Sequence, residues 1–279
     1  MKIFLTAASA LLFASSVDAH ASLVTPASRE GGKETFADER NVVGCGKPGP
    51  GPVTQVRAGS EIPVMYYRNN HVGGFIRWSI IKRGEPETRE NFDKNVFYYT
   101  CRESGNDCKP RNGRPYTRWQ EAYDGTDNFV IPCGDKIRIP DYLADGDYVL
   151  QYTNFATGHN NGDPGLALPI YRSCADLHIT GGSASKPRPK CPTFVGGDRV
   201  TKAENLPSDQ CYYFHSNDIP NAVFREGNAP NYDGQYKFGR PADIDRCIAA
   251  GQNRDLFNVT ETEFLAEVPS AIHAYEGDF

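Results

Sequence analysis

Alternation of apolar and polar residues is the dominant pattern in the first two thirds of the chain, and it predicts short β-strands. In residues 61–67 the apolar side chains Ile62, Val64 and Tyr66 fall on one face, as a half-buried strand requires. Similar β-rich runs occur at residues 75–81, 95–101, 136–139, 148–155 and 168–180. Gly, Pro, Asn and Asp separate these runs, and this part has no long helical pattern. We therefore predict an antiparallel β-sandwich.

The first 19 residues have the pattern of a secretory signal peptide. Lys2 supplies a positive start, an apolar run follows, and Val17 and Ala19 are small residues at the positions that signal peptidase inspects. The alternative is a buried first helix, which would show an amphipathic stripe that this run lacks. Cleavage after Ala19 would make His20 the first residue of a secreted, extracellular chain.

Composition divides the rest of the chain into three parts. Residues 20–182 contain the predicted strands, and residues 183–190, rich in Ser, Lys and Pro, form a predicted linker. Residues 191–279 form a polar, loop-rich extension with three of the eight cysteines. Few strand runs are visible there, so we expect a partly ordered extension, and the alternative is a small disulfide-held carbohydrate-binding module. An even number of cysteines fits an oxidising destination.

Charge and hydropathy exclude two classes of partner. The formal net charge is −5, whereas a nucleic-acid-binding protein needs a basic surface. Beyond the N-terminus no apolar run approaches the roughly 20 residues of a membrane helix. We therefore expect no nucleic-acid or membrane partner, and a monomer. Asn258 begins an Asn-Val-Thr triplet and is a candidate glycosylation acceptor.

His20 and His71 are the candidate metal ligands. An N-terminal histidine offers its α-amine and its ring nitrogen to the same ion, and a second imidazole completes a set of three nitrogens. Such a nitrogen-rich, nearly planar set suits copper. His71 follows a predicted strand and precedes Gly73 and Gly74, which remove bulk beside it. Taken alone, His71 could equally be a turn residue with no ligand role.

Three features together resemble the lytic polysaccharide monooxygenases. They are His20 exposed by cleavage, the segment NHVGG at 70–74 and the segment YRSCAD at 171–176. The resemblance covers about residues 20–182 and implies an immunoglobulin-like β-sandwich with long loops. It also implies one copper per mature chain, held by His20 and His71 with Tyr171 in the axial position, and oxidative cleavage of a polysaccharide with an external reductant and O2 or H2O2. Without the resemblance, Tyr171 reads as an ordinary strand aromatic.

Within this group the chain most resembles the oomycete pectin-cleaving family, auxiliary activity family seventeen, and the motifs for this finer assignment are less specific than those for the superfamily. The NHVGG loop, the segment NFATGHNN at 154–161 and the cysteine-containing extension support this assignment. Cellulose-active relatives tend to carry a glutamine two residues before the axial tyrosine, where this chain has Pro169. We therefore consider His159 and Asn154 as candidates for the hydrogen bond that the glutamine would supply.

The family implies pectic homogalacturonan, a plant cell-wall polymer of galacturonic acid, as substrate. Residues 20–182 carry 19 Lys and Arg against 20 Asp and Glu, so this part is almost neutral and can still present a local basic face. Arg68, Arg77 and Arg172 are the candidate substrate-binding residues, because arginine grips a carboxylate with two parallel hydrogen bonds. The alternative is that these arginines are solvated or paired with acids.

The resemblance also implies a disulfide between Cys45 and Cys174. In the cellulose-active relatives a cysteine in a segment like CGKPG, here at 45–49, pairs with the one after the axial tyrosine. We further expect Cys101–Cys108, because seven residues suit a local loop, and Cys133 paired into the extension.

Two other classes of function remain open. One is a copper-binding protein with the same ligands and no oxidative activity, and the other is a non-catalytic cell-wall-binding protein. Release of oxidised oligosaccharides would distinguish the enzyme from both.

Overall fold

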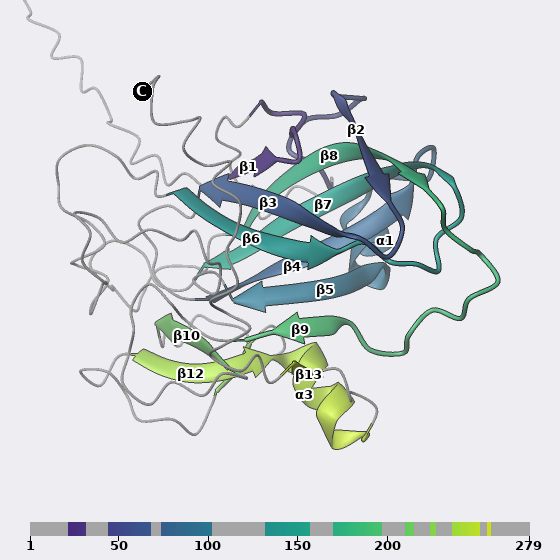
Figure 1. The fold of residues 1–279 in the computed structure, drawn as a ribbon. Coiled ribbons are helices and arrows are strands. Elements are labelled where there is room, and N and C mark those ends of the chain that lie inside the picture. Colours follow the sequence, from purple (N-terminus) through teal and green to yellow (C-terminus); the bar gives the residue numbers. More distant parts are fainter. Residues whose placement is uncertain are drawn as a thin grey trace, which may run out of the picture.

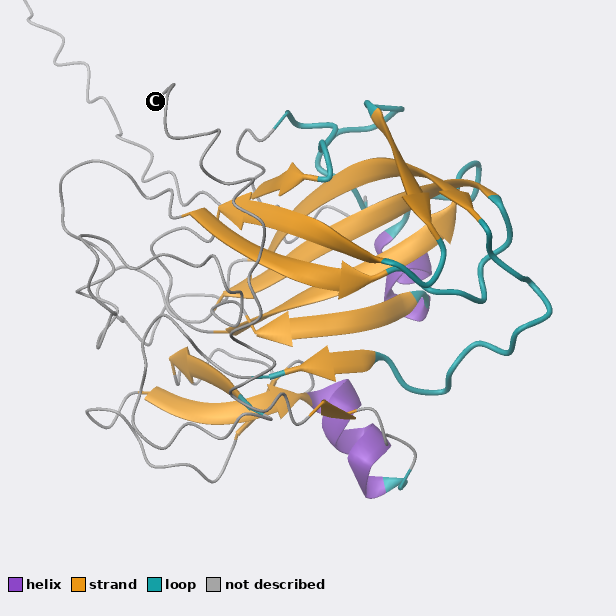
Figure 2. Cartoon of the chain, viewed as in Figure 1, coloured by secondary structure: helices purple, strands orange, loops and turns teal. Residues whose placement is uncertain are grey.

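The chain folds as an all-β sandwich with an extension attached to one side (Figure 1; Figure 2). The computed structural model describes residues 22–31, 44–67, 74–101, 132–156, 170–196, 210–214, 224–226, 236–251 and 256–257. The strands are β1 (Ser22–Thr25), β2 (Val53–Arg57), β3 (Glu61–Tyr67), β4 (Gly74–Lys82), β5 (Val96–Cys101), β6 (Pro132–Arg138), β7 (Gly146–Ala156), β8 (Ile170–Thr180), β9 (Thr193–Val195), β10 (Cys211–Phe214), β11 (Phe224–Glu226), β12 (Tyr236–Pro241) and β13 (Leu256–Phe257). The described helices are α1 (Arg89–Lys94) and α3 (Ala242–Ala249).

Two sheets form the sandwich. The smaller has the order β1-β3-β6, and the larger has the order β13-β9-β5-β4-β7-β8-β2. Their inner faces enclose one apolar core, to which the alternate residues of each strand contribute, as expected for strands with one buried face. The bulkiest members of this core are Trp78 and the tyrosines Tyr66, Tyr98, Tyr148 and Tyr152. The predicted sandwich is therefore confirmed.

The alternation in the sequence located the central strands. The predicted strand at residues 61–67 is β3, and Ile62, Val64 and Tyr66 are all buried. The other predicted runs correspond to β4, β5, β6, β7 and β8, with ends that differ by a few residues. Three strands join the large sheet in parallel, because β2 pairs with β8, β9 pairs with β5 and β13 pairs with β9.

The extension is built onto the large sheet. β9 pairs with β5, and β13 pairs with β9, so the sheet continues into residues beyond 190. Ile244 of α3 packs with Phe75, Tyr99 and Phe155 on the outer face of the large sheet. These contacts bury an apolar surface that the core sandwich would otherwise expose.

The segment predicted as a linker, residues 183–190, contacts the sandwich. Lys186 Nζ lies 2.7 Å from Asp141 Oδ2. The Arg188 guanidinium donates to the Asn95 side chain at 2.9 Å and to the carbonyl oxygens of Lys94 and Val96 at 3.0 Å each. Arg188 therefore fixes the path of this segment beside β5.

Three disulfides join described residues, and they correct part of the predicted pairing. Cys45 pairs with Cys174, as the resemblance implied. Cys101 pairs with Cys211 across 110 residues, so the predicted Cys101–Cys108 bond is wrong. Cys191 pairs with Cys247. All three cysteines of the extension are thus paired elsewhere, and Cys133 does not pair into it.

The predicted Cys101–Cys108 bond relied on the short distance between these cysteines in the sequence. β5 ends at Cys101 on the outer face of the large sheet, where the side chains of Cys101 and Cys211 are buried in the same apolar cluster as Phe75 and Phe194. Packing of the extension against the sheet brings Cys101 and Cys211 together, and the short distance in the sequence between Cys101 and Cys108 does not decide the pairing.

Among the described helices, none is long and apolar enough to cross a membrane.

The Cys101–Cys211 bond should stabilise the attachment of the extension. We expect the double variant Cys101→Ser/Cys211→Ser to lose about 2–4 kcal/mol of unfolding free energy, because the bond closes a loop of about 110 residues in the unfolded chain. Urea unfolding measures this loss. Peptide mapping without reduction should recover the Cys101–Cys211 linked peptides, and recovery of Cys101 joined to Cys108 would contradict the pairing.

Candidate functional site

Seven strands of the two sheets begin or end together at one end of the sandwich, namely β1, β3, β4, β5, β6, β7 and β8. Ser22, the first residue of β1, pairs with Tyr67, the last residue of β3. In the large sheet Gly74 pairs with Ala156, and Phe155 pairs with Ile170. We call this the loop end of the sandwich. The arrowheads of β3 and β5 point toward it on the left of Figure 1.

Two observations show that the loop ends of the two sheets coincide. The backbone amide of Leu23 donates to the Ser173 hydroxyl at 3.2 Å, which joins the start of β1 to the start of β8. The rings of Tyr66 and Tyr152 lie 5.5 Å apart, which joins the end of β3 to the end of β7. The small sheet therefore lies over the large one at this end.

Several predicted site residues lie outside the described residues. These are His20, Arg68, His71, Cys108, His159 and Asn258. His20 precedes Ser22 by two residues, and His71 lies four residues after Tyr67 and three before Gly74. The chain segments that carry both histidines therefore leave described strands at the loop end.

Tyr171 lies at the loop end and faces the interior of the sandwich. It is the second residue of β8 and is 4% exposed. Ser173 and Ala175 lie on the same face because strand residues alternate, and Ala175 belongs to the sandwich core. The face of β8 that carries Tyr171 is therefore the face that contacts β1 through Leu23 and Ser173.

Asn154 lies directly opposite Tyr171 in the pairing of β7 with β8. Its side chain is fully buried, and neither its amide nitrogen nor its amide oxygen has a hydrogen-bond partner among the residues that the structure describes. A buried polar group without a partner costs about 1–3 kcal/mol, so such a group calls for a specific reason. Tyr171 and Asn154 are the two predicted site residues that the structure brings together at the loop end.

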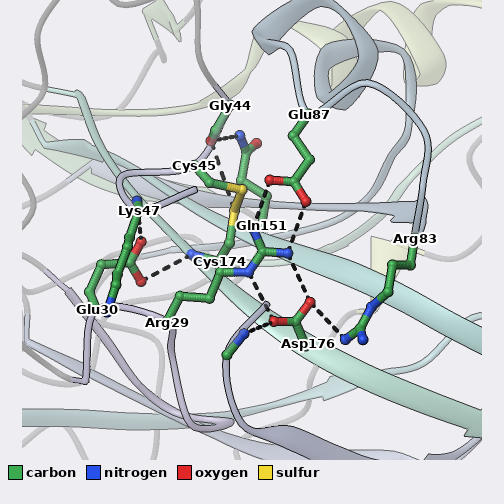
Figure 3. Close-up of polar contacts among 11 residues, drawn as sticks. Arg29, Glu30, Gly44, Cys45, Lys47, Arg83, Glu87, Gln151, Cys174 and Asp176 are labelled. Atoms are coloured by element: carbon green, nitrogen blue, oxygen red, sulfur yellow. Dashed lines mark hydrogen bonds and ion pairs between the residues drawn. A yellow bond between two sulfur atoms is a disulfide. The ribbon is translucent and has the colours of Figure 1, made fainter. Parts of the chain in front are cut away.

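The turn after β1 is held by a buried group of charges (Figure 3). Arg29 donates from Nε to Asp176 Oδ2 at 2.9 Å and from Nη2 to Asp176 Oδ1 at 2.8 Å. It also donates from Nη1 and Nη2 to the two carboxylate oxygens of Glu87, at 2.7 and 2.9 Å. Arg29 is 5% exposed and Asp176 is fully buried. We call this group the Arg29 clamp.

One further hydrogen bond and one further ion pair complete the shell around Asp176. The backbone amide of Gly51 donates to Asp176 Oδ2 at 2.5 Å, and Arg83 Nη2 lies 3.0 Å from Asp176 Oδ1. A side chain at Gly51 would collide with Arg29, whose Cγ would lie 2.8 Å from the added Cβ, so glycine permits this close approach. Burial alone would raise the pKa of the Asp176 carboxyl. The hydrogen bonds from Arg29 and Gly51, together with the charges of Arg29 and Arg83, hold its pKa below the usual value.

The clamp and the Cys45–Cys174 disulfide act on the same segments. Glu30, next to Arg29, accepts from the backbone amides of Lys47 at 3.1 Å and Cys174 at 3.4 Å. Burial raises the pKa of the Glu30 carboxyl, although these two hydrogen bonds oppose the rise. Gln151 of β7 donates to the Gly44 carbonyl oxygen at 2.5 Å. The turn after β1 and the segment around Cys45 are thus fixed to β7 and β8.

Sequence analysis missed the Arg29 clamp because charged residues are usually assigned to the surface. No local pattern distinguishes Arg29 from the exposed arginines, since its partners Glu87 and Asp176 lie 58 and 147 residues away. The location of Asp176 two residues after Cys174 is the only local signal, because it places Asp176 on the strand that the disulfide anchors.

Arg77 and Arg172 lie together on the outer face of the large sheet, which is the face opposite Tyr171. Both pair with Thr153 in the register of β4, β7 and β8. Arg77 lies 2.5 Å from Asp93 and over the ring of Phe155. Arg172 is 6% exposed, and burial with the nearby charges of Arg89 and Arg77 lowers its pKa to about 10, so it remains charged at neutral pH. The structure therefore separates these arginines from Tyr171.

Copper fits the nitrogen donors predicted from the sequence, namely one amine and two imidazoles. Within the residues that the structure describes, no group of three His, Cys, Asp or Glu side chains could hold a metal ion. His178, a described histidine, lies on β8 with its ring nitrogen 2.8 Å from Asp147, in an exposed pair. The predicted site residues that the described part contains at the loop end are Tyr171 and Asn154.

Several solved structures align with part of the chain. The AA10 lytic polysaccharide monooxygenase from Streptomyces lividans is 14% identical, with a TM-score of 0.28 over 46% of this chain and 59% of that one. A cellulose-active polysaccharide monooxygenase from M. thermophila is 15% identical, with a TM-score of 0.32 over 61% of this chain and 67% of that one. T. fusca AA10A is 12% identical, with a TM-score of 0.35 over 58% of this chain and 100% of that one.

These alignments are partial. The chain spans 59% of the length of the Streptomyces lividans enzyme and 55% of the length of HiLPMO9B, a further structure that aligns with it. No protein-family model matches the chain, and no curated protein sequence is significantly similar to it. The function proposed below therefore rests on the residues of this chain.

The Arg29 clamp should contribute strongly to stability. We expect Arg29→Met to lower the free energy of unfolding by about 3–5 kcal/mol, because it leaves the carboxylates of Asp176 and Glu87 without their main partner. Arg138→Met is the matched control, since Arg138 forms an exposed pair with Glu61 at 3.2 Å. That control should lose less than about 1 kcal/mol. Equal losses in the two variants, measured by urea unfolding, would refute the clamp.

Proposed function

We propose that this protein is a secreted, copper-dependent lytic polysaccharide monooxygenase. The observation that carries the proposal is the pairing of Ser22 with Tyr67 at the loop end. His20 precedes Ser22 by two residues, so the length of the chain limits the His20 Cα to within about 7 Å of the Ser22 Cα. His71 follows Tyr67 by four residues, so its Cα is limited to within about 14 Å of the Tyr67 Cα. Because Ser22 and Tyr67 are paired across neighbouring strands, their own Cα atoms lie about 5 Å apart. This spacing supports binding of one copper by both histidines.

Each residue has a distinct task in this proposal. After cleavage behind Ala19, the His20 amine and ring and the His71 ring would hold the ion. Tyr171 would lie on the buried side of the ion and limit access to it from that side. The partnerless amide of Asn154, opposite Tyr171, is available for the hydrogen bond that a glutamine supplies in cellulose-active relatives. Bound copper, with an external reductant and O2 or H2O2, supplies the oxidative chemistry that cleaves the polysaccharide.

We infer that the Arg29 clamp has a supporting role in this scheme. A free N-terminal amine can serve as a ligand only if the first strand is fixed, because terminal residues are otherwise poorly ordered. β1 is held by β3, by the Leu23–Ser173 hydrogen bond and by Arg29 in the turn that follows it. These contacts hold Ser22, the residue two positions after the proposed ligand.

We further propose homogalacturonan as the substrate, on the strength of the sequence resemblance. Arg77 and Arg172 do not support cleavage of this substrate at the proposed copper site, because they face away from Tyr171. Arg68, three residues before His71, remains the candidate for contact with a galacturonate carboxylate. Its proximity in sequence to a proposed copper ligand is the observation in its favour.

Copper binding should depend on correct processing at His20. We expect the processed protein to bind one copper, and a form with an added Met before His20 to bind more than about 100-fold more weakly, because the amine ligand is lost. Losses of 10–100-fold already follow changes to groups that only support a ligand. His71→Ala should weaken binding comparably. Isothermal titration measures the affinity, and His178→Ala, which removes an exposed histidine of β8, is the matched control.

Copper binding that is as tight with the added Met as without it would refute the proposed ligands. An unchanged affinity in His71→Ala would refute the second ligand alone. Tight copper binding without oxidised products would identify a copper-binding protein rather than an enzyme.

The substrate is tested by mass spectrometry of products from pectin, cellulose and chitin, with copper and ascorbate. We expect oxidised oligogalacturonides from polygalacturonate, fewer products after full methyl esterification, and fewer at higher salt. Exposed charge contacts are screened over about 8–10 Å at ordinary ionic strength. Arg68→Gln should reduce activity on polygalacturonate, and His71→Ala should abolish it. Oxidised products from cellulose or chitin alone would refute the pectin proposal and leave the copper proposal standing.

A further inference from the structure

The outer face of the large sheet carries a group of positive charges that the proposed copper site does not use. Arg77, Thr153 and Arg172 lie side by side on β4, β7 and β8. Helix α1 packs against β4 here, and its Phe92 is buried in a cluster with Ile81, Val149 and the Cys45–Cys174 disulfide. The acid Asp93 and the base Arg89 come from the same helix. We call Arg77, Arg89 and Arg172 the arginine group.

Among the residues that the structure describes, the arginine group has little negative charge around it. Asp93 contacts two of its members, with Arg77 at 2.5 Å and Arg89 at 3.7 Å. Arg172 forms no hydrogen bond or ion pair through its side chain with any residue that the structure describes, and its Nε is buried without a partner. One carboxylate therefore serves three guanidinium groups.

Arg29 is a second buried arginine of this chain, and its partners can be compared with those of Arg172. Arg29 and Arg172 are equally buried, at 5% and 6% exposed. Arg29 contacts two carboxylates with all of its nitrogen atoms. Arg172 has none, and a buried charge without a partner costs several kcal/mol. Such a cost is expected where a ligand supplies the missing charge.

Exposure to solvent increases from Arg172 on the sheet toward helix α1. Arg89 and Asp93 have side chains that are 46% and 38% exposed, whereas Arg77 is 12% exposed. The group therefore runs from an exposed rim on α1 to the buried Arg172 on the sheet. A guanidinium binds an oxyanion through two parallel hydrogen bonds, and Arg172 has its nitrogen atoms available for this.

We propose that Arg172, with Arg77 and Arg89, forms a binding site for an oxyanion such as a carboxylate. The site is separate from the proposed copper site, because Arg172 and Tyr171 point to opposite faces of β8. It goes beyond the proposed function and holds whether or not copper binds. The oxyanion comes either from the uronate of a polysaccharide or from a small free anion.

Thermal unfolding of the full mature chain in EDTA tests the site without copper. Trigalacturonate, its methyl ester and sulfate are each added at constant ionic strength, adjusted with sodium chloride. A ligand that binds only the folded state raises the unfolding midpoint as its concentration rises. We expect the wild-type midpoint to rise with trigalacturonate or sulfate and to stay unchanged with the methyl ester.

Arg172→Met is the informative variant. Without added oxyanion it should be at least as stable as the wild type, since it removes an unpaired buried charge, and its midpoint should not respond to the anions. Arg172→Gln is a second variant of similar polarity that should also lose the response. Arg138→Met removes an exposed, paired arginine and should respond as the wild type does.

The anion that acts identifies the source of the ligand. A response to trigalacturonate alone indicates a uronate, and a response to sulfate alone or to both indicates a site for oxyanions in general. No response in the wild type, or an equal response in Arg172→Met, would overturn the proposal. Because copper is absent throughout, this outcome is independent of whether His20 and His71 bind copper.

Discussion

The neutralisation of Asp176 is the interaction on which the arrangement of this sandwich depends. Asp176 is fully buried in the middle of β8, and a lone carboxylate there would be prohibitively costly. Its partners come from separate parts of the chain: Arg29 after β1, Gly51 before β2 and Arg83 after β4. The carboxylate is stable only if all three segments are in place. One buried charge thereby couples three loops that share little apolar surface.

This coupling explains how a strand of four residues can be held in place. β1 is too short to bury much apolar area, and Leu23 is its one residue in the sandwich core. The strand gains its position from hydrogen bonds to β3 at one side and from Arg29 at its following turn. The Cys45–Cys174 disulfide adds a covalent link two residues from Asp176. Precise positioning at the N-terminus therefore comes from polar and covalent contacts, and the apolar core supports the longer strands.

The sequence predicted the parts of the fold that follow from alternation, and it missed those that follow from distant contacts. Ile62, Val64 and Tyr66 face the core as their spacing indicated. β2 was missed because it is an edge strand with no buried residue, so it has no apolar face to detect. The pairing of Cys101 with Cys211 was missed because it depends on docking of the extension. The site residues divide in the same way: Tyr171 and Asn154 came from local motifs, whereas Arg29 has partners that only the folded chain brings near.

β8 shows why a sequence motif can combine residues with separate tasks. Tyr171, Arg172, Ser173 and Cys174 are consecutive, and the sequence suggested that Tyr171 and Arg172 serve one site. Strand geometry sends Tyr171 and Ser173 to the interior with β1, and Arg172 and Cys174 to the outer face with α1 and the Cys45 segment. A substitution on the inner face of β8 at the loop end can therefore leave the charged residues on its outer face unchanged. A single strand that is buried on both faces contributes to two chemically independent surfaces, because consecutive side chains point to opposite faces of the sheet.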